Sequence, residues 1–75
     1  MNELIRILND LHPGVDFENA TDLIDGGILD SLDIVTLITE INDTFGVSIP
    51  AEEIIPENFN SAKAIFDLIE KIDEA

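Results

Sequence analysis

The side chains best suited to chemistry lie around a single serine. Ser31 stands between Asp30 and Asp33, shortly after the Gly26-Gly27 pair. A serine hydroxyl acts as a nucleophile when a base and an orienting acid accompany it. The only histidine, His12, precedes a Pro-Gly pair that ends a helical segment, and we expect it to be exposed there rather than to act as a base. The sequence therefore argues against a serine hydrolase.

Other site types fail on the identity or spacing of their residues. Aligning Gly26 with the invariant glycine of an EF-hand loop places Leu23 and Leu32 where oxygen ligands are required. The Gly26-Gly27 pair also lacks the spacing and the lysine of a P-loop. Because the chain has no cysteine, it can form neither a disulfide framework nor a thiolate zinc site. We expect no specific metal site.

Composition limits the class of protein. The chain has 75 residues, of which 17 are Asp or Glu and 3 are Lys or Arg, giving a formal net charge of −14. This charge repels nucleic acid and favours basic protein partners. No apolar run is long enough to span a bilayer. We therefore expect residues 1–75 to form one domain, and we expect a cytoplasmic, monomeric protein.

Apolar spacing and stop signals predict where the first helices lie. A first helix follows an Asn2 cap and ends at His12-Pro13-Gly14. Residues 15–29 read as a long loop whose apolar side chains hold it against the helices, and loops of this length are often functional. A second helix runs over Ser31–Phe45, after an Asp30 cap and before Gly46. Its third residue, Asp33, completes a capping box.

The remainder of the chain predicts one short and one longer helix. Residues 51–54 form one helical turn, which Pro56 ends. Asn60 or Ser61 caps the last helix, whose apolar stripe contains Ala62, Ile65, Leu68, Ile69 and Ile72. No segment alternates long enough to be a strand. The expected fold is all-α, a small four-helix bundle of three longer helices and one short helix, with a long loop between the first and second helices.

The second helix has two apolar faces. One continuous arc predicts the side that packs into the core: Ile34, Leu37, Ile38, Ile41 and Phe45. A neighbouring arc near the helix start holds Leu32, Val35, Thr36 and Thr39, with carboxylates at Asp33, Glu40 and Asp43 around it. These residues either pack under the long loop or form a docking surface for a basic partner.

Ser31 itself has two interpretations. Serine at a helix start is common as a capping residue, and Ser31 could simply be a second cap. Alternatively, its hydroxyl lies exposed beside unpaired backbone N–H groups at the positive end of the helix dipole, where a phosphate ester would be favoured. Asp30 and Asp33 oppose an added negative charge, so that gain is partial.

The segment Gly27-Ile28-Leu29-Asp30-Ser31-Leu32-Asp33 resembles the attachment motif of acyl carrier proteins. The resemblance extends over nearly the whole chain. It includes the first helix, the long loop, and three later segments: Phe45-Gly46-Val47, Ile49-Pro50 and Phe59-Asn60-Ser61.

This resemblance implies a carrier rather than an enzyme. Ser31, within the motif residues Asp30, Leu32 and Asp33, would carry 4′-phosphopantetheine, transferred from coenzyme A by a magnesium-dependent phosphopantetheinyl transferase. The arm supplies the thiol that holds cargo as a thioester. The acyl-loading ligase or transferase and the acyl-processing enzymes would dock through basic patches, which maps the partner surface to Asp30, Leu32, Asp33, Val35, Thr36, Thr39, Glu40 and Asp43.

Two departures from the usual pattern bear on cargo and partners. The main interpretation is a carrier of acyl intermediates in fatty acid or polyketide synthesis. However, Ile28-Leu29 is bulkier than the pair usual before Asp-Ser in fatty-acid carriers, and Thr36 stands where many of them have Glu. The alternative is an aminoacyl or D-alanyl carrier loaded by an adenylating ligase. Alternatives from other classes are an unmodified acidic adaptor and a divalent-ion buffer.

Overall fold

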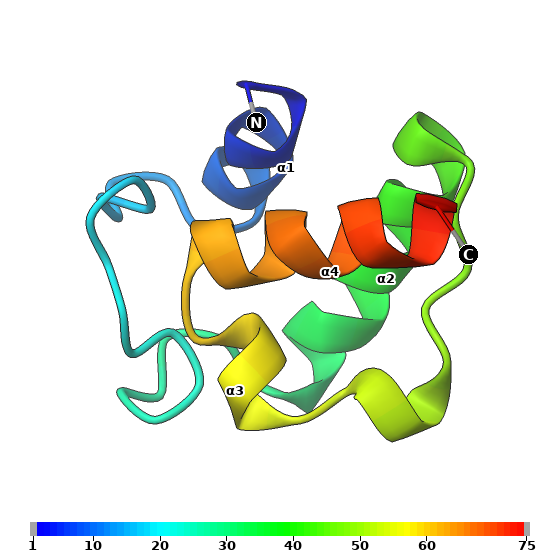
Figure 1. Ribbon diagram of the computed structural model, residues 1–75. Coiled ribbons are helices and arrows are strands. Elements are labelled where there is room, and N and C mark those ends of the chain that lie inside the picture. The colour runs from blue at the N-terminus through cyan, green and yellow to red at the C-terminus, as the bar shows by residue number, and fades with distance from the viewer. Residues whose placement is uncertain (1, 75) are drawn as a thin grey trace.

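A computed structural model describes residues 2–74, and all of its regular structure within that range is helical. The elements are α1 (Asn2–Leu11), α2 (Ser31–Phe45), the 3₁₀ turn η1 (Ala51–Glu53), α3 (Pro56–Phe59) and α4 (Ala62–Glu74). In Figure 1, α4 crosses the front of the molecule, with α1 above it and α3 below. The predicted all-α fold of three longer helices and one short helix is confirmed, as is the long loop between α1 and α2.

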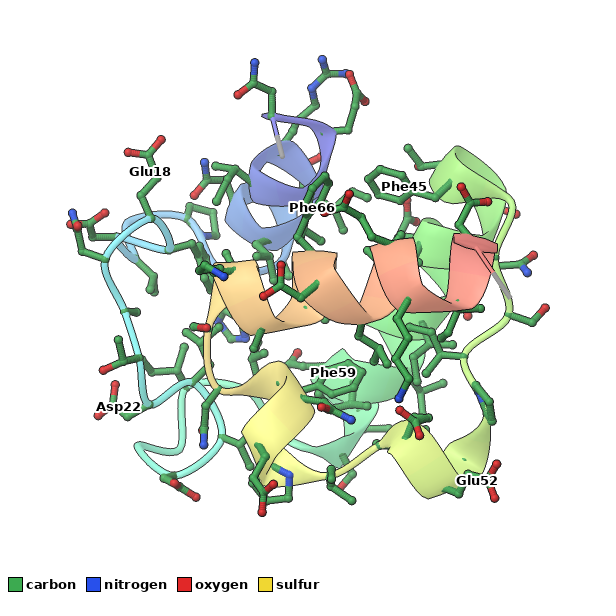
Figure 2. The ribbon with its side chains drawn as sticks, in the orientation of Figure 1. Glu18, Asp22, Phe45, Glu52, Phe59 and Phe66 are labelled. Carbon is green, nitrogen blue, oxygen red and sulfur yellow. The ribbon has the colours of Figure 1, made fainter. Side chains whose placement is uncertain are left out.

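The core forms where the apolar sides of the helices meet. Leu4 and Leu8 from α1, Leu37 and Ile41 from α2, and Ile65 from α4 are fully buried. Burying each such side chain stabilises the fold by roughly 1.5–3 kcal/mol. Figure 2 shows Phe59 extending from α3 into the space beneath α4, so the short helix is also anchored to the core.

The loop between α1 and α2 packs onto the helices, as the sequence predicts. Phe17, Leu23 and Leu29 lie in this loop, and all three are buried. Phe17 and Leu23 are among the largest fully buried side chains. The loop therefore forms part of the core, and it delivers the chain to the start of α2 in a fixed position.

The bounds predicted for α2 are confirmed, and both ends carry local caps. Asp30 adopts an extended backbone conformation (φ −105°, ψ −175°) before the first helical residue. Gly46 adopts the left-handed conformation (φ 70°), and its N–H donates to the Asn42 carbonyl at 3.0 Å. A residue with a Cβ is strained at such a φ, which is why glycine ends the helix.

Two predicted boundaries are wrong. Pro56 begins α3 rather than ending the preceding turn, because a proline fits the first helical position, where no N–H is needed. The preceding turn, η1, closes instead through the Ile54 N–H, which donates to the Ala51 carbonyl at 3.1 Å. Asn2, expected as a cap, already lies within α1.

The junction between α3 and α4 resolves the choice between two capping residues. Ser61 caps α4, because its Oγ accepts a hydrogen bond from the Ala64 N–H at 3.0 Å. Asn60 has a different role: its Oδ1 accepts from the N–H groups of Ile24 and Asp25 at 3.0 and 3.1 Å. The Asn60 side chain therefore holds the long loop against the junction between α3 and α4, shortly before the loop enters α2.

The membrane-spanning criterion is not met anywhere in the described part of the chain. No helix within residues 2–74 combines the length and the apolar character needed to cross a bilayer.

Candidate functional site

Ser31 is the first residue of α2, and it is exposed. The residues on either side of it complete the helix cap without its hydroxyl. The Asp33 N–H donates to Asp30 Oδ1 at 2.9 Å, and the Asp30 N–H donates to Asp33 Oδ2 at 3.2 Å. The capping box predicted from sequence is therefore present, and Ser31 Oγ is not required to stabilise the helix start.

His12 does not occupy the exposed position expected from the sequence. It is half-buried, and its Nε2 lies 2.7 Å from Asp33 Oδ2. Because an ionised carboxylate can only accept, Nε2 carries the hydrogen of this bond. The contact joins the end of α1 to the start of α2, across 21 residues of sequence. His12 thus reaches the residues around Ser31 through Asp33.

This arrangement fixes the charge state of Asp33. The hydrogen bond from His12 lowers the pKa of the Asp33 carboxyl below its ordinary value of 3.8. The hydrogen bond from the Asp30 N–H and the charge of the imidazole act in the same direction, whereas burial opposes them. Asp33 is therefore ionised at neutral pH, and one of its oxygens is already shared between two donors.

A cleft of about 200 Å³ opens beside Ser31, between the start of α2 and α3. Apart from Asp30 and Ser31, its lining is apolar: Ile24, Leu29, Ile34, Ile54, Pro56 and Phe59. Such a surface can shelter a hydrocarbon segment, and Asp30 is the one charged residue in its lining.

The outer face of α2 is open to solvent. The side chains of Leu32 and Val35 are 77% and 62% exposed, so the interpretation in which they pack under the loop is wrong. Thr36 and Thr39 are exposed as well, and their hydroxyls donate to the carbonyls of Leu32 and Val35 at 3.1 and 3.0 Å. The threonine hydroxyls are thus directed back onto the helix, and the face is mainly apolar.

Carboxylates border this face, and the bases of the chain are bound elsewhere. Glu40 and Asp43 are exposed on α2. The three Lys and Arg residues form ion pairs with other carboxylates: Arg6 with Glu3 at 3.2 Å, Lys63 with Asp67 at 2.8 Å, and Lys71 with Glu53 at 3.2 Å. Within residues 2–74, no Lys or Arg side chain pairs with Glu40 or Asp43, so these two carboxylates present negative charge on the α2 face.

Sequence reasoning missed two exposed apolar residues between η1 and α3. Ile54 and Ile55 are 38% and 42% exposed, and Ile54 lines the same cleft as Ser31. The signal was available, since two adjacent isoleucines precede Pro56 in a segment with no helical stripe to bury them. Within the described residues, no group of three or more His, Asp and Glu side chains is arranged to hold a metal ion.

Comparison with known families places these features in context. The sequence model of the family described as "Phosphopantetheine attachment site" matches residues 2–69, and the chain belongs to this family. Its members carry covalently attached 4′-phosphopantetheine. The site fits such a group, because an exposed hydroxyl stands at the N-terminal end of a 15-residue helix, beside an apolar cleft.

The chain also resembles individual carriers. It is 43% identical over 54 residues to a D-alanyl carrier protein of Streptococcus equi subsp. zooepidemicus, covering 72% of this chain and 68% of that protein. It is 37% identical, over the same coverage, to a D-alanyl carrier protein of Streptococcus pyogenes serotype M5. A chain in a solved structure titled "Crystal structure of FAD-dependent dehydrogenase" is 42% identical, with a TM-score of 0.75, over 87% of this chain and 94% of that one.

These findings confirm the expected class of protein. The protein is a phosphopantetheine carrier rather than an enzyme, as the sequence predicts. The relatives, however, favour the aminoacyl alternative over the main interpretation of a carrier for fatty acid or polyketide synthesis.

Proposed function

We propose that Ser31 carries the 4′-phosphopantetheine group and that the protein holds an aminoacyl residue, D-alanine in the first instance, as a thioester. The observation that carries the proposal is the reciprocal cap between Asp30 and Asp33, which leaves the exposed Ser31 hydroxyl without a structural task. When bound, the group supplies a thiol on a flexible arm, which a chain without cysteine otherwise lacks.

The chain provides the acceptor oxygen for this modification but not the base. Ser31 Oγ would form the new bond to phosphorus while adenosine 3′,5′-bisphosphate leaves coenzyme A. The only histidine donates to Asp33 at 2.7 Å and is held there, so we expect a group of the transferase to take the hydroxyl proton. This division is consistent with a protein that presents a residue to an enzyme.

The cleft beside Ser31 predicts where an aminoacyl cargo would lie. The ammonium group of D-alanine would have to lose its hydration to enter a space whose lining is largely apolar. A short aminoacyl group therefore stays in solvent at the end of its arm, where the next enzyme can reach it. The D-alanyl carriers among the relatives point to the same cargo.

Partner enzymes would dock on the outer face of α2. Leu32 and Val35 offer exposed apolar surface, Thr36 and Thr39 extend it, and Glu40 supplies charge. Asp43 adds a second carboxylate one turn away. Asp30 and Asp33 lie at the start of this face, but their carboxylates are engaged in the cap, so we expect them to contribute less to docking than Glu40.

The attachment site is tested by intact mass. The unmodified chain is incubated with a broad-specificity phosphopantetheinyl transferase, coenzyme A and magnesium. We expect one added arm on the wild type and on Ser48→Ala, a control at another exposed serine, and none on Ser31→Ala. An arm on Ser31→Ala, or no arm on the wild type, would contradict the proposal. The second result would favour an unmodified acidic adaptor.

The cargo is tested separately on the modified protein. We expect an adenylating ligase specific for D-alanine to load the arm in the presence of ATP, and the loaded mass to be lost with hydroxylamine. Malonyl transfer by an acyltransferase is the matched comparison. Loading by the acyltransferase alone would return the cargo to fatty acid or polyketide intermediates.

A second candidate function concerns what happens to the loaded thioester. The similar solved structure is titled as a FAD-dependent dehydrogenase, and 94% of its matched chain aligns with this one, so that chain is about as long as this carrier. This supports presentation of the thioester to a flavin-dependent dehydrogenase. When the loaded carrier is mixed with a flavin-dependent dehydrogenase without oxygen, the acyl group should lose two hydrogens (two electrons and two protons) as FAD is reduced to FADH2, which bleaches the flavin; an unchanged flavin spectrum would remove this candidate.

A further inference from the structure

His12 reaches the start of α2 from a fixed position at the end of α1. Its backbone N–H donates to the Leu8 carbonyl at 3.0 Å, and its carbonyl accepts from the Val15 N–H at 3.4 Å. Leu8 is fully buried, so the first of these bonds ties His12 to the core. The imidazole therefore extends to α2 from backbone that is held on both sides.

The imidazole shares one oxygen of Asp33 with the helix cap. Asp33 Oδ2 accepts from His12 Nε2 at 2.7 Å and from the Asp30 N–H at 3.2 Å. The second distance lies at the long end of the usual range for N–H···O bonds. His12 thus makes the shorter contact to this oxygen, and the bond that belongs to the cap is the longer one.

Burial makes the Asp33 carboxylate depend on its partners. The side chain of Asp33 is only 22% exposed, and that of His12 is 34% exposed. A carboxylate that loses a donor in such surroundings gains by turning toward water, because an unpaired polar group costs free energy where solvent is restricted. That rotation would also break the bond from the Asp30 N–H, since both donors share Oδ2.

Ser31 lies directly after the residue that this oxygen holds. The Asp30 carbonyl accepts from the Ile34 N–H at 3.0 Å, so the Asp30 backbone sets the direction in which α2 begins. If the Asp30 N–H were released, the chain at residues 30–31 could leave this conformation. The Ser31 hydroxyl would then be presented in several orientations instead of one.

We propose that His12 is a positioning residue for the modification of Ser31, an inference that rests on the proposed function. His12 acts through Asp33: by donating to Oδ2, it keeps the cap closed and holds Ser31 in one orientation before the transferase binds. Where the cap is open in a fraction of the molecules, the transferase has to select the capped ones, which raises KM for the carrier in proportion and leaves kcat unchanged.

The first test measures the cap without any enzyme. Hydrogen exchange of the Asp30 N–H, which donates to Asp33 Oδ2, reports how often the cap opens. We expect this exchange to be faster in His12→Ala than in wild type. The control Ser61→Ala removes the cap of α4 and should speed exchange of the Ala64 N–H while leaving that of the Asp30 N–H unchanged. Unchanged exchange of the Asp30 N–H in His12→Ala would overturn the proposal.

The second test uses the transferase. KM and kcat for the unmodified carrier are measured with wild type, His12→Ala and Ser61→Ala, at a temperature at which circular dichroism shows all three to be folded. We expect KM to rise about threefold in His12→Ala with kcat unchanged, and to change by less than about 1.5-fold in Ser61→Ala. Equal KM values in wild type and His12→Ala, or equal rises in both variants, would show that His12 has no specific role in modification.

A double-mutant cycle tests whether His12 acts through Asp33. If it does, His12→Ala raises KM in the wild-type background and adds little in the Asp33→Ala background, where the contact is already lost. If His12 instead touches the transferase directly, the same rise appears in both backgrounds, and the positioning role is wrong.

The two proposals fail in different ways. A wild-type chain that is never modified would end the proposed function and, with it, the role of His12 in modification. A chain that is modified at Ser31 with the same KM in wild type and His12→Ala would retain the proposed function and remove only the role of His12.

Discussion

Asp30 and Asp33 form reciprocal hydrogen bonds across Ser31, so the cap of α2 does not depend on the Ser31 hydroxyl. Each carboxylate accepts the backbone N–H of the other residue. If Ser31 capped the helix through its oxygen, esterification of that oxygen would destabilise the helix. The cap made by Asp30 and Asp33 does not involve this oxygen. The negative charges of the two caps work against an added phosphate, but the N–H groups of the first turn favour it.

Substitutions at Asp30 separate the contribution of the capping hydrogen bond to stability from the contribution of the negative charge. Asp30→Ala and Asp30→Asn both remove one negative charge, but asparagine caps a helix about as well as aspartate. We expect Asp30→Ala to have a free energy of unfolding about 1 kcal/mol lower than that of Asp30→Asn. Urea denaturation measures both. Equal stabilities would show that the bond from Asp33 N–H to Asp30 Oδ1 contributes nothing.

The lowered pKa of Asp33 predicts how the free energy of unfolding depends on pH. Its pKa is lowered in the folded chain, chiefly by His12, so the folded state binds a proton at Asp33 less readily than the unfolded state does. This contribution is fully present above the unfolded pKa, near 3.8, and is lost as the pH falls through the lower folded pKa. The difference in stability between wild type and Asp33→Asn should therefore shrink as the pH falls below about 4.

His12→Gln provides the control for that measurement. Removing the imidazole removes the largest cause of the lowered pKa, so His12→Gln should weaken the acid dependence that Asp33 contributes. Melting curves from pH 6 down to about pH 2.5 would show it. If the melting temperatures of wild type, Asp33→Asn and His12→Gln fell in the same way as the pH was lowered, the 2.7 Å contact between His12 and Asp33 would not contribute to stability in solution.

The ends of α2 could be predicted because each is set by residues adjacent to it in sequence. Asp30 and Asp33 form a local cap, and Gly46 takes a conformation that other residues disfavour. The exposed position of Ser31 at the start of α2 could be predicted for the same reason, and its modification stays a prediction. The partner of His12 could not, since Asp33 lies 21 residues away and only the packing of α1 against α2 brings the two together.

The short helix α3 could not be placed from the residues adjacent to it in sequence. Proline ends a helix when it follows helical residues and begins one when helical residues follow it. The sequence around Pro56 allows both. Burial of Phe59 in the core favours the second, and that burial depends on α2 and α4. The exposed pair Ile54 and Ile55 became evident only once this segment was placed.

The two faces of α2 predict opposite outcomes for leucine substitutions. Leu37→Ala empties a fully buried position and should cost about 2–5 kcal/mol of stability, whereas Leu32→Ala removes a side chain that is 77% exposed and should change stability by less than about 0.5 kcal/mol. Leu32→Ala should nevertheless slow modification by the transferase. A large loss of stability in Leu32→Ala would show that this face packs against the protein in solution.

Charge dominates the molecule as a whole. A net charge of −14 is carried on a chain whose three Lys and Arg residues are all paired, so like-charge repulsion among the remaining carboxylates opposes compaction. We expect the melting temperature at neutral pH to rise with added potassium chloride, because salt screens exposed charges. Sucrose at equal osmolarity is the control for solvent effects. A melting temperature that does not respond to salt would contradict this account.

The same charge and the small size suit a protein that works by being bound. The core uses most of the large apolar side chains, and two clefts, one beside Ser31 and one between α1 and α2, have volumes of about 200 and 120 Å³. Neither encloses a substrate together with a base and a nucleophile. In the proposed function, the chemistry comes from the attached group and from partner enzymes, which the acidic surface would attract.

Locating the modification on the unaltered chain tests the central claim most directly. After treatment with transferase, coenzyme A and magnesium, cleavage on the carboxyl side of glutamate places each serine in a separate fragment: Ser31 in 19–40, Ser48 in 41–52 and Ser61 in 58–70. We predict that tandem mass spectrometry finds the arm only in the fragment 19–40, on Ser31. An arm on either other fragment, or on a threonine of the same fragment, would contradict the account.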